Sequence, residues 1–237
     1  MFGSWLRRLL GMRGESAVPA LERYTAPRPL VNQQSGLDDA NASVDLPIDL
    51  EADMREYIRR EIWGGYSDRA GAIDFGIEMF ADQADPALLR PISERLVNEA
   101  LADHAREAAT WPEVTDYDRL VAAFGSLERD GIVARQNFTC CGSCGAAEIW
   151  DEIEAADAKG GRSRGYAFFH MQDTENAADG GGLYLNYGAC ADGEAAALGV
   201  AHEIVAHLEK AGLKTEWDGK FQCRIGVSID WKRRRQD

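Results

Sequence analysis

The spacing of apolar residues divides the chain into a helical first half and a second half in which strands alternate with helices. Between Leu50 and Arg129, apolar residues recur three or four positions apart, which is the period of an amphipathic helix. Gly64 follows the first of these stretches, and the Asp85-Pro86 pair precedes the third, as helix ends and starts commonly do. The pattern predicts four helices, over residues 50–63, 73–83, 87–110 and 116–129.

After residue 130 the apolar positions alternate with polar ones, which is typical of strands that cover a core with one face. Leu183 and Leu185, for example, fall on one face and Tyr184 on the other. The same alternation places Cys223 in the buried row of the last strand, as a small apolar residue. The predicted strands are 131–138, 165–171, 181–188, 213–217 and 223–231, and the helices between them are 146–158 and 194–211.

These elements predict an α+β fold, with a helical N-terminal lobe packed on a mainly antiparallel sheet that carries two further helices. We expect a single domain over residues 47–237, with the helical lobe at 47–129 and the sheet lobe at 130–237. Residues 1–46 are rich in proline and polar residues and are expected to form a tail and linker. The basic start, residues 1–13, is compatible with peripheral membrane contact, but a bare tail is the simpler expectation.

Charge and composition exclude several classes of function. Forty acidic and 26 basic side chains give a net charge of -14, which repels the phosphates of nucleic acids and anionic membranes. No apolar run approaches the roughly 18 residues of a membrane-spanning helix, so no transmembrane segment is expected. The basic run KRRR at residues 232–235 is interpreted as a solvated tail. Five cysteines, an odd and clustered number, favour a reducing cytoplasm over a secreted disulfide protein.

The segment NFTCCGSCGAAEIW, residues 137–150, is the strongest candidate for chemistry, because it gathers three cysteines between a strand and a helix. Three interpretations stay open. In the first, the cysteines only pack under the sheet. In the second, Cys140, Cys141 and Cys144 bind a metal together with His170, and zinc is the best match. In the third, Cys141 and Cys144 form a redox pair, with Cys141 as the attacking thiolate and Cys144 as the resolving thiol. Convergence of all three sulfurs requires a sharp turn at Cys140 or Cys141, which the nearby Gly142 would permit.

A second cluster of polar residues lies in HMQDTENAADGGG, residues 170–182. Asp173, Thr174 and Glu175 are candidates for a small-molecule site, with His170 and Tyr184 as acid-base groups. The competing interpretation is that Asp173 or Thr174 caps one helical turn that the glycines terminate.

The HEIVAH segment is not expected to bind zinc, because the five-residue separation of its histidines directs them away from each other on a helix.

Several of these segments resemble an uncharacterised bacterial family, one of the domains of unknown function. The resemblance rests on N-F-x-C-C-x-x-C-G at residues 137–145, Q-D-T-E at 172–175 and G-G-G-L-Y-L at 180–185, and it runs from about residue 50 to the end. It implies that both lobes form one unit, and it implies no activity, cofactor or partner. We expect a cytosolic, non-catalytic domain whose cysteine loop is structural and compatible with zinc; the alternative is a thiol-disulfide or peroxide-reactive protein.

Overall fold

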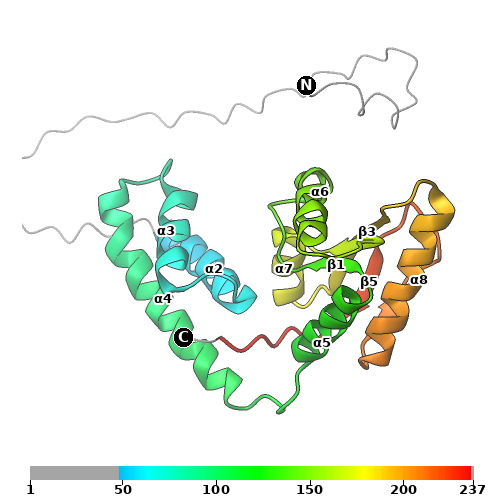
Figure 1. Ribbon diagram of the computed structural model, residues 1–237. Coiled ribbons are helices and arrows are strands. Elements are labelled where there is room, and N and C mark those ends of the chain that lie inside the picture. The colour runs from blue at the N-terminus through cyan, green and yellow to red at the C-terminus, as the bar shows by residue number, and fades with distance from the viewer. Residues whose placement is uncertain (1–47, 236–237) are drawn as a thin grey trace, which may run out of the picture. The chain divides into compact units, whose positions relative to one another are not determined.

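The computed structural model describes residues 48–235 and confirms the α+β class (Figure 1). This part of the chain contains seven helices and one five-stranded, mostly antiparallel sheet. The predicted tail and linker at residues 1–46, including the segment 1–13 considered for membrane contact, lie outside the described residues. Within residues 48–235, none of the helices has both the length and the apolar character that crossing a bilayer requires.

Three helices build a first core. They are α2 (Ile48–Gly64), α3 (Arg69–Phe80) and α4 (Pro86–Ala108). Asp68 and Asp85 cap the second and third, each accepting a backbone N–H with its carboxylate. The apolar positions of the three helices meet in a buried cluster in which Met54, Ile58, Ile62, Leu89 and Val97 are fully buried. The helical period of the sequence therefore identifies this core correctly.

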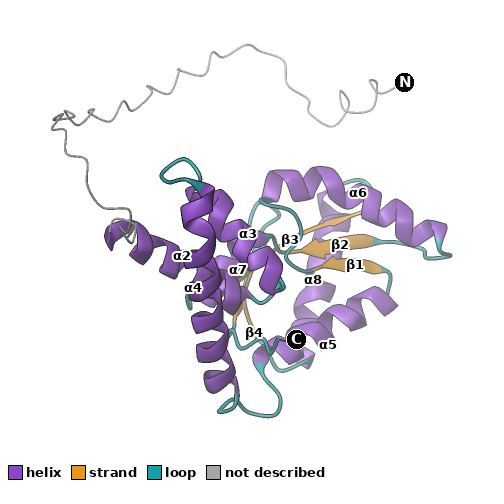
Figure 2. Ribbon diagram, turned by 90° about the vertical axis from the view of Figure 1, so that its left-hand side faces the viewer, coloured by secondary structure: helices purple, strands orange, loops and turns teal. Residues whose placement is uncertain are grey.

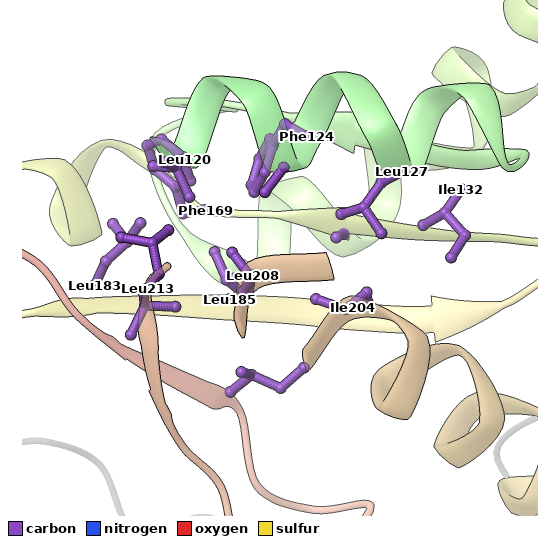
Figure 3. Close-up of a cluster of buried hydrophobic side chains, with 14 of the residues drawn as sticks. Leu120, Phe124, Leu127, Ile132, Phe169, Leu183, Leu185, Ile204, Leu208 and Leu213 are labelled. Atoms are coloured by element: carbon purple, nitrogen blue, oxygen red, sulfur yellow. The ribbon is translucent and has the colours of Figure 1, made fainter. Parts of the chain in front are cut away.

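The fourth predicted helix, α5 (Asp116–Arg129), packs on the sheet rather than on the first three helices. Thr115 caps it with a reciprocal capping box, in which Asp118 accepts the backbone N–H of Thr115 at 2.8 Å. Its buried stripe, Leu120, Phe124 and Leu127, joins the core of the sheet (Figure 3).

The sheet has the strand order β1-β2-β3-β5-β4. Only β1 and β2 are parallel, with Ile132 opposite Gly165; the other pairs are antiparallel. A parallel pair needs a crossover, and α6 supplies it. The remaining bounds are β1 (Ile132–Arg135), α6 (Gly142–Ala158), β2 (Gly165–Phe168), α7 (Met171–Ala178), β3 (Leu183–Ala189), α8 (Glu194–Lys210), β4 (Lys214–Glu216) and β5 (Ile225–Ser228).

Helices cover both faces of the parallel part of the sheet (Figure 2). Val133 and Phe168 point to α6 and pack with its Ile149, whereas Ile132 points to the opposite face, where α5 and α8 form the larger core. Successive strand residues alternate between the two faces, as the pleat requires.

Three expectations from the sequence need correction. Cys223 is exposed, because β5 begins only at Ile225 and the preceding residues form a turn. The stretch after His170 forms the eight-residue helix α7 rather than a single turn. The basic run at residues 232–235 is not a solvated tail, because Arg233 and Arg235 are half-buried and bond to other segments.

Candidate functional site: a three-cysteine loop

The cysteine loop is built by two residues with left-handed backbone. Asn137 has a φ of 50° and Thr139 a φ of 59°. Asparagine adopts this region readily, whereas a β-branched threonine does so only when its surroundings hold it there. Here the surroundings are the segment after β2: the N–H of Phe138 donates to Phe169 O at 2.8 Å, and the N–H of Met171 donates to Thr139 O at 3.1 Å. The left-handed residues thus lie just before the cysteines, whereas the sequence predicts the turn at Cys140 or Cys141.

The turn brings the three sulfurs together. The Sγ atoms of Cys140, Cys141 and Cys144 all lie within 4.8 Å of one another, and those of Cys140 and Cys144 are 3.5 Å apart. All three are free thiols, Cys140 exposed and the other two half-buried. Cys141 is the N-cap of α6, and Cys144 lies in its first turn. Packing alone does not describe this arrangement, since the sulfurs face one another instead of separate apolar surroundings.

The helix start polarises the thiols in opposite directions. The backbone N–H of Cys144, then the Cys144 thiol and the N–H of Ser143, lower the pKa of Cys141, although no fully formed hydrogen bond to its side chain caps the helix. Hydrogen bonding with the Cys140 and Cys141 thiols, and then the charges of those two groups, raise the pKa of Cys144 to about 11. Three thiols this close together do not all deprotonate, because their negative charges would repel one another. A bound cation would remove this obstacle by replacing their protons.

His170 lies next to the loop but belongs to a different set of contacts. A Cβ added to Gly142 would be 3.6 Å from His170 Nε2, which shows how closely the ring approaches the start of α6. The Nδ1 atom accepts the backbone N–H of Asp173 at 3.3 Å, and Nε2 lies 3.0 Å from the Asp173 carboxylate. His170 is thus the N-cap of α7, and its ring is not part of the group of three sulfurs.

Arg224 completes this second set. Its Nη1 donates to both carboxylate oxygens of Asp173, at 3.0 and 3.1 Å, and its guanidinium lies 5.1 Å from the centre of the Tyr184 ring. Burial, and secondarily Arg224, lower the pKa of His170 in spite of Asp173, so its ring is neutral near pH 7. The residues His170, Asp173 and Tyr184 of the predicted polar site therefore do converge, around an arginine that sequence reasoning missed.

The other two residues of the predicted polar site face elsewhere. Thr174 donates its hydroxyl to Asn137 Oδ1 at 2.7 Å and so fixes the first left-handed residue of the cysteine loop. Glu175 faces α2, where burial, together with the charge of Glu61, raises its pKa against the opposing effect of Arg60. Asp173 acts as the N3 partner in a capping box, so the capping interpretation describes part of its role correctly.

Arg224 and Asn186 are the site residues that the sequence did not indicate. Arg224 lies 51 positions from Asp173, and no local spacing connects the two. Asn186 lies beside the start of α6, with Oδ1 3.6 Å from a Cβ placed on Gly142, and its buried Nδ2 has no hydrogen-bond partner among the described residues. Asn186 could be connected with the site only through its pairing with Phe168 in the sheet, and this pairing follows from the strand register rather than from the sequence.

Comparison with protein families gives one match that spans these features. A family model described as a domain of unknown function, DUF6891, matches residues 48–235, which is the whole described region. Comparisons with curated proteins and with solved structures gave no match.

Proposed function

Because the chain belongs to the DUF6891 family, whose description assigns no activity, we propose from the geometry that this domain is a non-catalytic metal-binding module. Its ligands are the thiolates of Cys140, Cys141 and Cys144. The observation that carries the proposal is the convergence of the three sulfurs within 4.8 Å at the start of a helix. The same sulfurs are free thiols, which suits a cytoplasmic, reducing environment.

Zinc is the metal that this donor set fits best. A tetrahedral zinc ion binds thiolate sulfur at about 2.3 Å, so sulfurs around it lie a little under 4 Å apart. The distance of 3.5 Å between Cys140 Sγ and Cys144 Sγ needs only a small adjustment. Binding replaces protons by a cation and so relieves the crowding of three ionisable thiols. The ion would hold the loop against α6, which is a structural role.

The fourth ligand of the zinc ion would be either His170 or a water molecule. His170 would occupy it only after its Nε2 gave up the Asp173 carboxylate, which lies 3.0 Å away. Otherwise a water molecule would complete the tetrahedron. His170→Ala separates these cases: a loss of zinc affinity of more than about tenfold assigns the ring as a ligand, whereas an unchanged affinity assigns solvent.

The test is elemental analysis of protein purified without added metal. We expect about one equivalent of zinc in the wild-type protein and in Cys223→Ala, the matched control, since Cys223 is an exposed cysteine outside the cluster. Cys144→Ala should lose most of the metal. Less than about 0.1 equivalent in wild-type protein that has also been offered zinc and dialysed would remove the proposal.

A second function is favoured by one specific observation, the position of Cys141 at the N-cap of α6 with Cys144 three residues later. In a redox cycle, the Cys141 thiolate attacks one sulfur of a disulfide substrate and releases the other as a thiolate. The Cys144 thiolate then attacks Cys141 in the mixed disulfide and releases the second substrate thiol. The two protein thiols lose two electrons and two protons, and the substrate gains them.

Mass spectrometry distinguishes the two functions. Oxidised glutathione should convert a redox protein into a form lighter by two hydrogen atoms, with the bond mapped to Cys141 and Cys144, and Cys144→Ala should stop at the mixed disulfide. If wild-type protein stays reduced in oxidised glutathione and keeps its zinc, the metal-binding proposal stands alone.

A further inference from the structure

A large cavity lined by several charged side chains lies outside the group of three cysteines. Its volume is about 980 Å³, within the range of small-molecule sites. The loop from α2 to α3, the start of α5 and the C-terminal segment form its walls. Four arginines line it, Arg69, Arg233, Arg234 and Arg235, against the two aspartates Asp68 and Asp118, which gives the lining a net charge of +2. In a chain of charge -14, such a concentration of positive charge needs an explanation.

The two aspartates are already engaged. Asp68 accepts the backbone N–H of Gly71 at 2.7 Å as the cap of α3. Asp118 accepts the N–H and the hydroxyl of Thr115, at 2.8 and 2.9 Å, and lies 3.5 Å from Arg234 Nη1. The two carboxylates therefore bond to the starts of α3 and α5, and only Arg234 among the four arginines lies near one of them.

Within residues 48–235, two of the arginines have only neutral hydrogen-bond partners. Arg69 donates its Nε to Asn98 at 3.0 Å, and Arg233 donates its Nε to the Tyr117 hydroxyl at 2.9 Å. The Nη1 atom of Arg233 is buried and has no hydrogen-bond partner within the described part of the chain. A half-buried guanidinium with a buried, unpartnered N–H group is costly unless an anion reaches it.

A network of aromatic and polar side chains holds Arg233 in place. Its guanidinium stacks on the Tyr66 ring, 3.9 Å from the ring centre. The Tyr66 and Tyr117 hydroxyls both donate to Gln136 Oε1 at 2.9 Å. Burial strongly raises the pKa of Tyr66, so its hydroxyl stays protonated and the network carries no negative charge of its own. The positive group is thus preorganised rather than free to turn into solvent.

We propose that this cavity binds a small polyanion, a molecule with at least two phosphoryl or carboxylate groups, with Arg233 and Arg69 as its main ligands. Guanidinium groups pair with either oxyanion through parallel N–H donors. An aromatic base is not expected in the ligand, because one face of Tyr66 is taken by Arg233 and its ring also packs against Phe169 and Trp231. The net charge of the chain still repels large polyanions.

Calorimetric titration of the full chain with pyrophosphate and, separately, with citrate tests this site. We expect wild-type protein to bind one equivalent of at least one probe with a Kd below about 1 mM, and Arg233→Gln or Arg69→Gln to weaken it by about tenfold or more. Binding of pyrophosphate alone would assign a phosphoryl ligand, and binding of citrate alone a carboxylate ligand.

Arg162→Gln is the matched control, since Arg162 is exposed and does not line the cavity. Arg69 is also exposed, so its variant keeps the test valid if Arg233→Gln fails to fold. Absence of binding to wild-type protein at about 5 mM of either probe, or equal affinities in all three variants, would overturn the proposal.

Discussion

At the scale of single residues, the chemistry of this domain depends on side chains that touch although they are far apart in sequence. The buried His170 and Asp173 contact the exposed Arg224, which comes from a distant segment. Asn137 and Thr174 join the cysteine loop to α7 by one hydrogen bond. These contacts fix the positions of side chains whose residue types suggested chemistry, and burial lowers the pKa of His170.

The buried imidazole predicts a pH dependence of stability. Desolvation lowers the pKa of His170 in the folded state, so the unfolded chain binds the proton more readily. The contribution of His170 to the free energy of unfolding should therefore be fully present above about pH 6.5. It should fall as the pH drops below this value, by at most about 1.4 kcal/mol per pH unit. Urea titrations between pH 5 and 7 would measure this slope.

His170→Gln should lose that slope, whereas His202→Gln, which alters an exposed histidine on α8, should keep it. Equal slopes in both variants would show that His170 titrates normally.

At the scale of elements, periodicity located the helices well and the turns poorly. The predicted bounds of α5 agree with the structure, because its apolar stripe is regular and Thr115 marks its start. The start of α6 was placed four residues late, since cysteine and glycine carry no helical pattern. The helix α7 was missed for a related reason: it is short and mostly polar, and it exists because a histidine, an unusual cap, holds its first turn.

Close packing of α6 on the sheet explains why the last position of the cysteine motif, Gly145, has no side chain. A Cβ at Gly145 would overlap the Phe168 ring, 2.7 Å from Cζ, whereas one at Gly199 on α8 would meet nothing within 4 Å. Gly145→Ala should cost about 1–3 kcal/mol of unfolding free energy. Gly199→Ala should add up to about 1 kcal/mol, because alanine favours the helix. Denaturant midpoints measure both, and stabilisation by Gly145→Ala would contradict this packing.

At the scale of the whole described region, the C-terminal segment connects the two cores. Trp231 packs with Tyr66, Tyr117 and Phe169, and its Nε1 donates to Trp63 O at 3.0 Å. Arg234 and Arg235 donate to backbone carbonyls of the loop before α5 and of the end of α2. This connection could not be predicted from the sequence. A run of consecutive arginines has no helical or strand period, and its partners are main-chain oxygens, which every residue carries.

Removing the central side chain of this connection should weaken the entire domain. Trp231 is 6% exposed and Trp150 is 36% exposed, so the two tryptophans form a matched pair. Trp231→Ala should lower the unfolding free energy by about 3–5 kcal/mol, whereas Trp150→Ala on the outer face of α6 should cost much less. Chemical denaturation followed by circular dichroism reports both, and equal losses would argue against a connecting role.

The paired backbone between the cysteine loop and the start of α7 has a mechanical consequence. Phe138 bonds to Phe169 and Met171 to Thr139, so the two segments form one stiff junction. The far side of α7 rests on α2, where Arg60 pairs with Asp179 at 2.8 Å. The helix α7 therefore joins the cysteine loop to α2 of the first helical core through bonds near both of its ends.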